Sequence, residues 1–314
     1  MGQTVKNSMA ESQILGNPFD LGDSAAYEGW KQWKLTAYPG DAGSLIVSLK
    51  DPNSLQAVEI KAITDLCAQC NMAIYQLEDT SQYGKSLVHA LGAQFGLTHL
   101  DSNLRADEDS VTSLEVREQA GNQYIPYTNK PLSWHTDGYY NTSDQQVRAV
   151  ILHCASPAAE GGVNFLLDHE LLYIYLRDEN PEWVRALMHP AAMAIPPNIE
   201  QGSELRGERI GPVFSVDPLS GSLHMRYSAR KKNIKWRDDA LTLEASSRMT
   251  ELLEDTSILF QHRLQAGQGL ISNNVLHNRT AFSDADDRKR LMYRARYFDR
   301  IADTQPGALP CMRG

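Results

Sequence analysis

The chain has 314 residues, of which 42% are hydrophobic, and its 39 acidic against 30 Lys and Arg side chains give a formal charge of −9. This acidic balance argues against a general nucleic-acid or membrane-surface role, because such partners are recognised by basic faces. No apolar run approaches the ~20 residues of a transmembrane helix, and residues 1–6 lack the start of a signal peptide. We therefore expect one domain over 1–314, cytoplasmic, with no nucleic-acid or membrane partner.

The four cysteines are too few for a disulfide scaffold. Cys67 and Cys70 form a CxxC pair, but no second Cys or His pair follows at zinc-finger spacing. The pair falls late in a helical pattern, away from the helix N-terminus, where the dipole would lower a thiol pKa. The pattern predicts two reduced thiols packed one helical turn apart.

The first 110 residues are expected to form an α/β lead, with an irregular stretch over 1–50. The segment 51–54, Asp-Pro-Asn-Ser, is typical of a helix start and predicts a helix over about 53–70. The apolar run 72–77 predicts a buried strand, and 83–95 predicts a second helix. We expect this lead to pack outside a catalytic core.

From about residue 111 the pattern changes to short β-rich runs separated by turn residues. Strands are expected over 111–117, 124–127, 147–154, 163–167, 191–195, 213–216, 223–227, 258–262, 269–272 and 291–298. Strands of this length and spacing are typical of a sandwich or of a barrel closed on itself. Helical insertions are expected over 168–188 and 238–254. The fold class is therefore mainly β with flanking helices, with a core over 111–300 and a loose tail after Asp303.

One short motif suggests metal chemistry. In Trp134-His135-Thr136-Asp137-Gly138, strand alternation places the imidazole and the carboxylate on the same side. A second imidazole, His277, follows the expected strand 269–272. Two histidines and one carboxylate can form the facial triad that binds Fe(II) and leaves the opposite positions open. With nine histidines in the chain, a His-x-Asp pair by itself is more often a pair of structural residues than a metal site.

The segment 288–298 carries arginines in alternation. In a strand, Arg290, Arg294 and Arg296 share one face with Met292. The other face then carries Leu291, Tyr293, Ala295 and Tyr297. The arginine face points either to solvent or into a cavity that contains anions. Arginine is a planar, permanently charged, bidentate partner for a carboxylate.

Taken together, these motifs resemble the TauD/TfdA family of Fe(II)/2-oxoglutarate-dependent dioxygenases, which includes taurine dioxygenase and is related to gamma-butyrobetaine hydroxylase. The matching segments, in order over about 125–300, are Trp134–Tyr139, Glu160–Asn164, Asn274–Phe282 and Arg290–Arg294. The resemblance implies a double-stranded β-helix (jelly-roll) core. It also implies an oxidoreductase that uses Fe(II), 2-oxoglutarate and O2 to hydroxylate a small molecule.

The resemblance also implies roles for individual residues. The implied iron ligands are His135, Asp137 and His277. Arg290, rather than Arg288, is implied as the partner of the distal carboxylate of 2-oxoglutarate, because of its spacing to Arg294. Asn164 stands where the family usually has a threonine that contacts the same carboxylate. Arg294 is expected to support the co-substrate or to reach an acidic group of the substrate.

Substrate residues are expected in two further places. Tyr139, Tyr140 and Asn141 directly follow the metal pair and are expected to line the pocket. Arg226 and Arg230 either meet an anionic substrate or belong to a solvated basic run. The arginines favour a small anionic or zwitterionic molecule, whereas the tyrosines suit a quaternary ammonium group through cation–π contact.

Alternatives remain open at this point. The carboxylate of Asp137 indicates hydroxylation rather than halogenation, but desaturation and epimerisation use the same residues. A jelly-roll sensor that binds metal without turnover would have no use for Arg290. A zinc hydrolase could use His135, Asp137 and His277. A homo-oligomer is compatible with every one of these interpretations.

Overall fold

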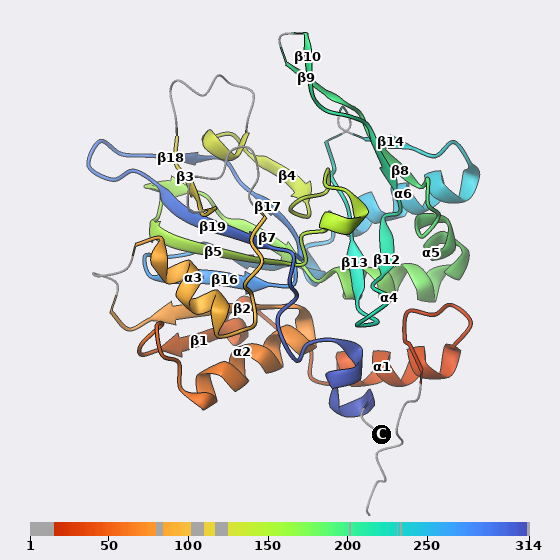
Figure 1. The fold of residues 1–314 in the computed structure, drawn as a ribbon, viewed down its shortest axis with the longest axis horizontal. Helices are drawn as coiled ribbons and strands as arrows, with labels where there is room; N and C mark the ends of the chain where they lie inside the picture. Colours follow the sequence, from red (N-terminus) through yellow and green to blue (C-terminus); the bar gives the residue numbers. More distant parts are fainter. Residues whose placement is uncertain are drawn as a thin grey trace, which may run out of the picture.

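The structure is a computed structural model that describes residues 16–79, 84–101, 110–116, 125–200, 202–230, 232 and 234–312. The segment 1–6, and the predicted element ends at residues 83, 117 and 124, lie outside these ranges. Two larger sheets form the centre of the described chain, and helices cover them on several sides (Figure 1). None of the helices in the described ranges is long and apolar enough to cross a membrane.

The larger sheet has six strands in the order β1–β2–β16–β5–β19–β3. Its strands are β1 (Ile46–Leu49), β2 (Met72–Leu77), β16 (Gln268–Ser272), β5 (Ala149–Ser156), β19 (Leu291–Tyr297) and β3 (Thr112–Leu114). The β1–β2 pair is parallel, and the other pairs are antiparallel. The predicted strand 72–77 is therefore part of this sheet, next to β16, rather than outside the core.

The second sheet has four antiparallel strands in the order β15–β7–β17–β4. They are β15 (Phe260–His262), β7 (Asn164–Leu167), β17 (Leu276–Arg279) and β4 (Leu132–His135). The register pairs His277 of β17 with His135 of β4. Two imidazoles that are distant in sequence are therefore cross-strand neighbours, with Cβ atoms about 4.5–5.5 Å apart in such a pair.

The two sheets enclose a common apolar cluster. Its members include Met72, Leu270, Cys154 and Met292 from the six-stranded sheet, with Leu166 and Phe260 from the four-stranded sheet. The opposite face of the six-stranded sheet is covered by α2 (Ala57–Cys70) and α3 (Ser86–Ala93). Ala295 and Tyr297 of β19 pack in this second cluster, whereas Met292 belongs to the first. This confirms the predicted alternation along 291–297.

A helical layer packs beside the sheets. It consists of α1 (Ser24–Thr36), α4 (His169–Glu179), α5 (Pro181–Leu187) and α6 (Ala240–Leu252). It packs with the two-stranded sheet of β12 (Phe214–Val216) and β13 (Leu223–Met225) in one apolar cluster. The single predicted helix 168–188 is divided, because Asn180 caps a new helix that has Pro181 at its first position.

The segment 193–211, called the arm below, has a base that packs in the apolar cluster of the helical layer and a tip that projects beyond it (Figure 1). It contains β8 (Met193–Ile195), β9 (Asn198–Glu200), β10 (Ser203–Arg206) and β11 (Arg209–Gly211). The β9–β10 hairpin projects outward, and β8 pairs with β11 on one side and with β14 (Lys235–Trp236) on the other. A further pair, β6 (Glu160–Gly161) and β18 (Phe282–Ser283), lies near the end of β17.

Several sequence predictions are corrected. The irregular lead contains α1, which begins after the Asp23 cap. The predicted strand 124–127 is a short 3-10 turn over Ile125–Tyr127, where Pro126 has no N–H for a sheet ladder. The helix expected from 53 begins at Ala57, because the Glu59 carboxylate accepts the Gln56 N–H.

The tail predicted to be loose is folded. Thr304, Pro306 and Leu309 are buried, and two short 3-10 turns cover Pro306–Ala308 and Pro310–Met312. Leu309 joins the apolar cluster that contains Trp30 of α1. The tail is held by apolar packing, which its Pro and Gly content does not reveal.

Candidate functional site

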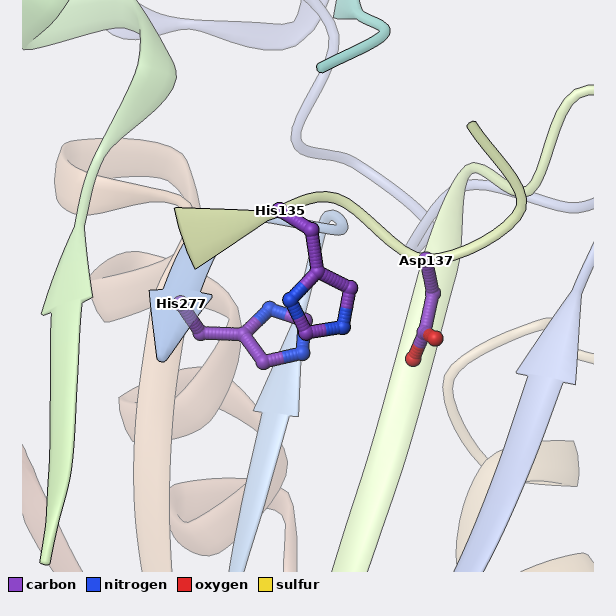
Figure 2. A group of neighbouring side chains, drawn as sticks. All are labelled: His135, Asp137 and His277. Carbon is purple, nitrogen blue, oxygen red and sulfur yellow. The ribbon is translucent and has the colours of Figure 1, made fainter. Parts of the chain in front are cut away.

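The three predicted metal ligands converge at one end of the four-stranded sheet. Figure 2 shows the His135 and His277 rings side by side, with the Asp137 carboxylate beyond them on the loop that follows β4. The ring centroids of the two histidines are 4.3 Å apart. One potential ligand atom from each of the three side chains lies within 4.8 Å of the other two.

Backbone carbonyls fix the orientation of both imidazoles. Nδ1 of His135 lies 2.9 Å from the Ser133 carbonyl, and Nδ1 of His277 lies 3.0 Å from the Val275 carbonyl. A ring that donates its Nδ1–H to a carbonyl carries its lone pair on Nε2, the arrangement in which histidine binds a metal. Burial, together with the neighbouring His277, lowers the pKa of His135 to about 3, so that its imidazole is neutral.

The carboxylate of Asp137 is buried and charged. Burial alone would raise its pKa, but the Arg294 guanidinium and the nearby His277 hold the pKa well below its usual range. Nη1 of Arg294 lies 2.9 Å from Oδ1 of Asp137. Oδ2 is buried and has no hydrogen-bond partner among the described residues. Two imidazoles and one carboxylate with an unpartnered oxygen form a donor set that fits Fe(II).

Asn274 holds the Asp137 loop in place. Its Oδ1 accepts the Asp137 N–H at 2.8 Å, and its Nδ2 donates to the carbonyls of Asp137 at 2.9 Å and Val147 at 2.7 Å. Asn274 itself has a positive φ of 53°, a conformation that Asn tolerates better than most residues. Two of these bonds are to the backbone of a metal ligand, so Asn274 determines where the Asp137 carboxylate can lie.

A small cavity between the sheets holds two of the three residues predicted to bind the co-substrate, while Arg294 lines the larger cavity described below. Asn164 and Arg290 both line it, together with Gly161 and Gly162 of the predicted turn. Arg290 is 5% exposed, and no carboxylate among the described residues lies within ion-pair distance of its guanidinium. Arg288 is exposed. A buried, unpaired guanidinium is costly unless an anionic ligand compensates it.

A much larger cavity, of about 1260 Å³, opens in front of the metal ligands. Small-molecule sites usually have volumes of about 300–1,000 Å³, so this cavity has room for a substrate larger than an amino acid. Its described lining contains seven basic residues and two carboxylates. The basic residues are Lys130, Arg206, Arg209, Arg230, Lys232, Arg294 and Arg296, and the carboxylates are Asp101 and Asp137. A chain with a formal charge of −9 thus concentrates positive charge in this one cavity.

The structure brings most of the predicted substrate residues to this cavity. Tyr139, Tyr140, Asn141 and Arg294 line it, as does Arg230. Tyr139 packs edge-on against His135 with ring centroids 6.5 Å apart, and Tyr140 packs edge-on against Tyr139 at 5.2 Å. The arginine face of β19 therefore points into cavities rather than to bulk solvent.

Arg226 does not line the cavity, so its predicted role in contacting substrate is replaced by a structural one. Its guanidinium donates to the carbonyls of Met193, Arg209, Gly211 and Pro212. Four of its five N–H groups are thereby used within the protein. The side chain ties β8 to β11 and so fixes the base of the arm.

Sequence reasoning did not identify the arm residues. Arg206 and Arg209 line the cavity, and the Arg206 guanidinium lies 5.8 Å from the centre of the Tyr140 ring. The sequence Arg206-Gly207-Glu208-Arg209 is basic, but its alternating charge is typical of an exposed turn. Asp101 and Arg296 were also not assigned as a pair, although their side chains approach to 2.6 Å.

Cys67 and Cys70 are both buried free thiols, as predicted. Burial raises the pKa of the Cys70 thiol to about 12. Neither residue lines a described cavity of the site.

Comparison with known proteins agrees with this geometry. The family model described as "Taurine catabolism dioxygenase TauD, TfdA family" matches residues 34–296. A uridine-5'-phosphate dioxygenase of Streptomyces sp. is 28% identical over 202 residues, covering 61% of this chain and 71% of that protein. A uridine-5'-phosphate dioxygenase of Amycolatopsis sp. is 29% identical over 173 residues, or 52% of this chain and 60% of that protein.

Among solved structures, the non-heme iron oxygenase OrfP in complex with Fe and alpha-ketoglutaric acid superposes with a TM-score of 0.55. The alignment covers 86% of this chain and 89% of OrfP at 15% sequence identity. At this identity the likeness concerns the fold.

Proposed function

The chain belongs to the TauD/TfdA family of dioxygenases, and from this premise we propose that it is an Fe(II)- and 2-oxoglutarate-dependent enzyme that hydroxylates an unactivated C–H bond of a small anionic molecule. The observation that carries the proposal is the convergence of His135, Asp137 and His277 beside a strongly basic cavity. We also propose that the two packed sheets form the double-stranded β-helix of this enzyme class.

The metal would be held by Nε2 of both histidines and by the unpartnered Oδ2 of Asp137. Iron bound there, with 2-oxoglutarate as reductant, would supply the oxidising power to insert one oxygen atom of O2 into a C–H bond as 2-oxoglutarate becomes succinate and carbon dioxide. The protein fixes the ligand atoms through the carbonyls of Ser133 and Val275 and through Asn274. It also excludes water from the buried carboxylate.

Arg290 would bind the distal carboxylate of 2-oxoglutarate, and the amide of Asn164 would donate to the same group. Both side chains line one small cavity, and Arg290 directly precedes β19, four residues before Arg294, which pairs with Asp137.

For the substrate, a phosphorylated nucleoside is the favoured class. The excess of arginine and lysine in the large cavity supports an anionic molecule. The two relatives from Streptomyces and Amycolatopsis are named as dioxygenases of uridine 5'-phosphate. The cavity volume and the tyrosine pair beside the metal ligands suit a molecule with a planar ring and a charged group.

The test is succinate formation from 2-oxoglutarate by the iron-loaded protein, started by admitting O2 to an anaerobic mixture. Nucleoside 5'-phosphates, the matching nucleosides, sulfonates and amino acids form the substrate panel. We expect succinate formation to require Fe(II) and to be stimulated by a nucleoside 5'-phosphate. Conversion of a panel member by the zinc-loaded protein in the absence of O2 would instead identify a hydrolase. Metal binding without succinate formation on any panel member would indicate a sensor.

A further inference from the structure

The charges inside the large cavity are distributed unevenly. Near the metal ligands, Arg294 is neutralised by Asp137 at 2.9 Å. Arg296 is neutralised by Asp101 at 2.6 Å, and its Nη1 donates to the Tyr140 hydroxyl at 2.8 Å. Two of the seven basic residues of the lining are therefore already compensated.

The arm presents the opposite situation. Arg206 and Arg209 are half-buried, and no carboxylate among the described residues lies within ion-pair distance of either guanidinium. Arg206 donates to the carbonyls of Gly207 and Pro196, and Arg209 to that of Glu208. Nε of Arg209 is buried without a described partner. Burial and the neighbouring Arg209 both lower the pKa of Arg206, so the two guanidinium groups repel each other.

The backbone of Arg209 is held by a buried side chain at the base of the arm. Arg226, beneath the arm, donates to the Arg209 carbonyl at 3.3 Å and to the Gly211 carbonyl at 2.9 Å. The repulsion between two like charges that are held close together raises the energy of the protein. An anion that lies between them, or screening by water, reduces this cost. The support that Arg226 gives to the arm backbone is present in the absence of ligand, which reduces the ordering cost of binding.

Aromatic rings connect the arginine pair to the metal ligands. Tyr140 lies between the Arg206 guanidinium, at 5.8 Å from its ring centre, and the Tyr139 ring, at 5.2 Å. Tyr139 in turn contacts His135. A substrate that reaches from the metal ligands to the arm must therefore pass along two tyrosine faces or edges.

We propose that Arg206 and Arg209 form an anion subsite that binds the phosphate group of the substrate, with the planar base of the same molecule packed on the Tyr139–Tyr140 pair. Two guanidinium groups in the lining of one cavity match the several oxygens and the double charge of a phosphate monoester better than a single carboxylate. The subsite is separate from Arg294, whose charge is already used by Asp137. This inference refines the proposed function, since it concerns the substrate of the same cavity.

The test is binding rather than turnover. Isothermal titration calorimetry under anaerobic conditions, with Fe(II) and 2-oxoglutarate present, compares uridine 5'-phosphate with uridine. The variants are Arg206→Gln, Arg209→Gln and the double variant, with Arg206→Lys to restore charge. Arg185→Gln is the matched control, because Arg185 is exposed on α5, pairs with Glu182 and does not line the cavity.

We expect each glutamine variant to raise the Kd of uridine 5'-phosphate about tenfold or more, as the loss of a charge-assisted hydrogen bond predicts. The Kd of uridine should remain unchanged, Arg206→Lys should recover part of the affinity, and Arg185→Gln should behave as wild type. Circular dichroism of each variant verifies that the fold is retained.

Three outcomes would overturn the subsite. Wild-type protein that binds uridine 5'-phosphate no more tightly than uridine would do so. Glutamine variants that bind uridine 5'-phosphate with unchanged affinity would also overturn it. So would an equal loss of affinity for uridine in these variants, because it would indicate that the two arginines have a structural role. The proposed function is judged separately by Fe(II)-dependent succinate formation. A protein that fails there but shows the phosphate preference and its loss would keep the subsite and lose the enzymatic assignment.

Discussion

The two ends of the large cavity differ in how their charges are held. At the metal end, each charged or coordinating side chain has a partner that fixes it: carbonyls for His135 and His277, and Arg294 for Asp137. At the arm end, Arg206 and Arg209 point into the cavity without a described carboxylate partner. The compensated end is organised to position atoms for chemistry, whereas the uncompensated end is organised to attract and orient an anion.

The ends also differ in their support. Behind the metal end lies a buried polar network that starts at Lys34 of α1, whose ammonium lies 2.7 Å from carboxylate oxygens of both Asp168 and Glu170. Asn71 continues it by donating to Asp168 and accepting from Asn273, the neighbour of Asn274. The base of the arm is held by Arg226, by the pairing of β8 with β14 and by the apolar packing of Met193 and Ile195. Mutations at the metal end should therefore affect metal affinity and stability, and those at the arm should affect only substrate affinity.

The strongest test of the metal end removes a ligand. Asp137→Ala should abolish succinate formation, with a loss above ~100-fold, since changes that only disturb a ligand's orientation already cost about 10–100-fold. His135→Ala should behave in the same way. Fe(II) binding, measured by equilibrium dialysis, should fall in parallel. His99→Ala, at an exposed histidine paired with Asp299, is the control; equal iron binding by Asp137→Ala and wild type would contradict the metal assignment.

The next largest effect is expected on stability. Lys34→Met leaves Asp168 and Glu170 buried without their cation, and breaking a buried pair in this way costs about 3–5 kcal/mol of unfolding free energy. Chemical denaturation measures this loss. Lys61→Met, at an exposed pair with Asp65, should change stability by less than about 1 kcal/mol. Similar denaturation midpoints for the two variants would show that the buried Lys34 network does not contribute to stability.

The same pair predicts a pH dependence. Burial alone would raise the pKa of Asp168, but the Lys34 ammonium holds it below its usual value. A carboxyl whose pKa is lower in the folded state stabilises the protein above its ordinary pKa of about 4, and this stability is lost as the pH falls below that value. Wild-type stability should therefore drop below about pH 4, and Lys34→Met should lose this part of the profile.

Co-substrate binding gives a test in the small cavity that Arg290 lines. Arg290→Ala should raise the 2-oxoglutarate KM about 10–100-fold, through the loss of a charge-assisted contact, with little change in Fe(II) affinity. Arg288→Ala is the matched control, because this arginine is exposed two residues away. Wild-type dependence on 2-oxoglutarate in Arg290→Ala would show that another cation holds the diacid.

A change at Asn274 tests the positioning of Asp137 without removing any of the three metal ligands. Asn274→Gly keeps the positive φ but removes the three side-chain hydrogen bonds around Asp137 and Val147. Iron affinity should fall roughly tenfold, the lower range for residues that orient a metal ligand. Asp303→Gly, an exposed position that also has positive φ, should leave it unchanged. Unaltered iron binding in Asn274→Gly would mean that the loop holds its shape without this clamp.

The smallest effect is expected from ionic strength. Added salt should change substrate binding at the arm end but not Fe(II) binding at the metal end. Screening lengths shrink from about 10 Å at 0.1 M salt to about 3 Å at 1 M. The substrate KM should therefore rise a few-fold as salt increases, because the arm charges are accessible, whereas the buried Asp137–Arg294 pair should keep Fe(II) affinity nearly constant. Steady-state kinetics and iron titration at several salt concentrations provide the comparison.

The sequence by itself determined the parts of this protein that depend on local periodicity. Alternation along 291–297 placed Arg294 on one face and Tyr297 on the other, as the two apolar clusters and the cavity lining confirm. This feature needs only the two-residue period of a strand, which the chain carries in its own order. The same reasoning brought His135 and Asp137 together, but β4 ends at His135 and Asp137 lies on the loop that follows.

Only the tertiary structure decided which distant side chains meet. It turned Arg226 toward four backbone carbonyls, brought Arg206 to Tyr140, and inserted Asn274 between Asp137 and Val147. It also gave Arg294 a carboxylate partner and left Arg290 without a described one. Such pairings depend on how the sheets and the arm pack against one another. The type of a side chain and its spacing along the sequence do not give its distance from a side chain on another element.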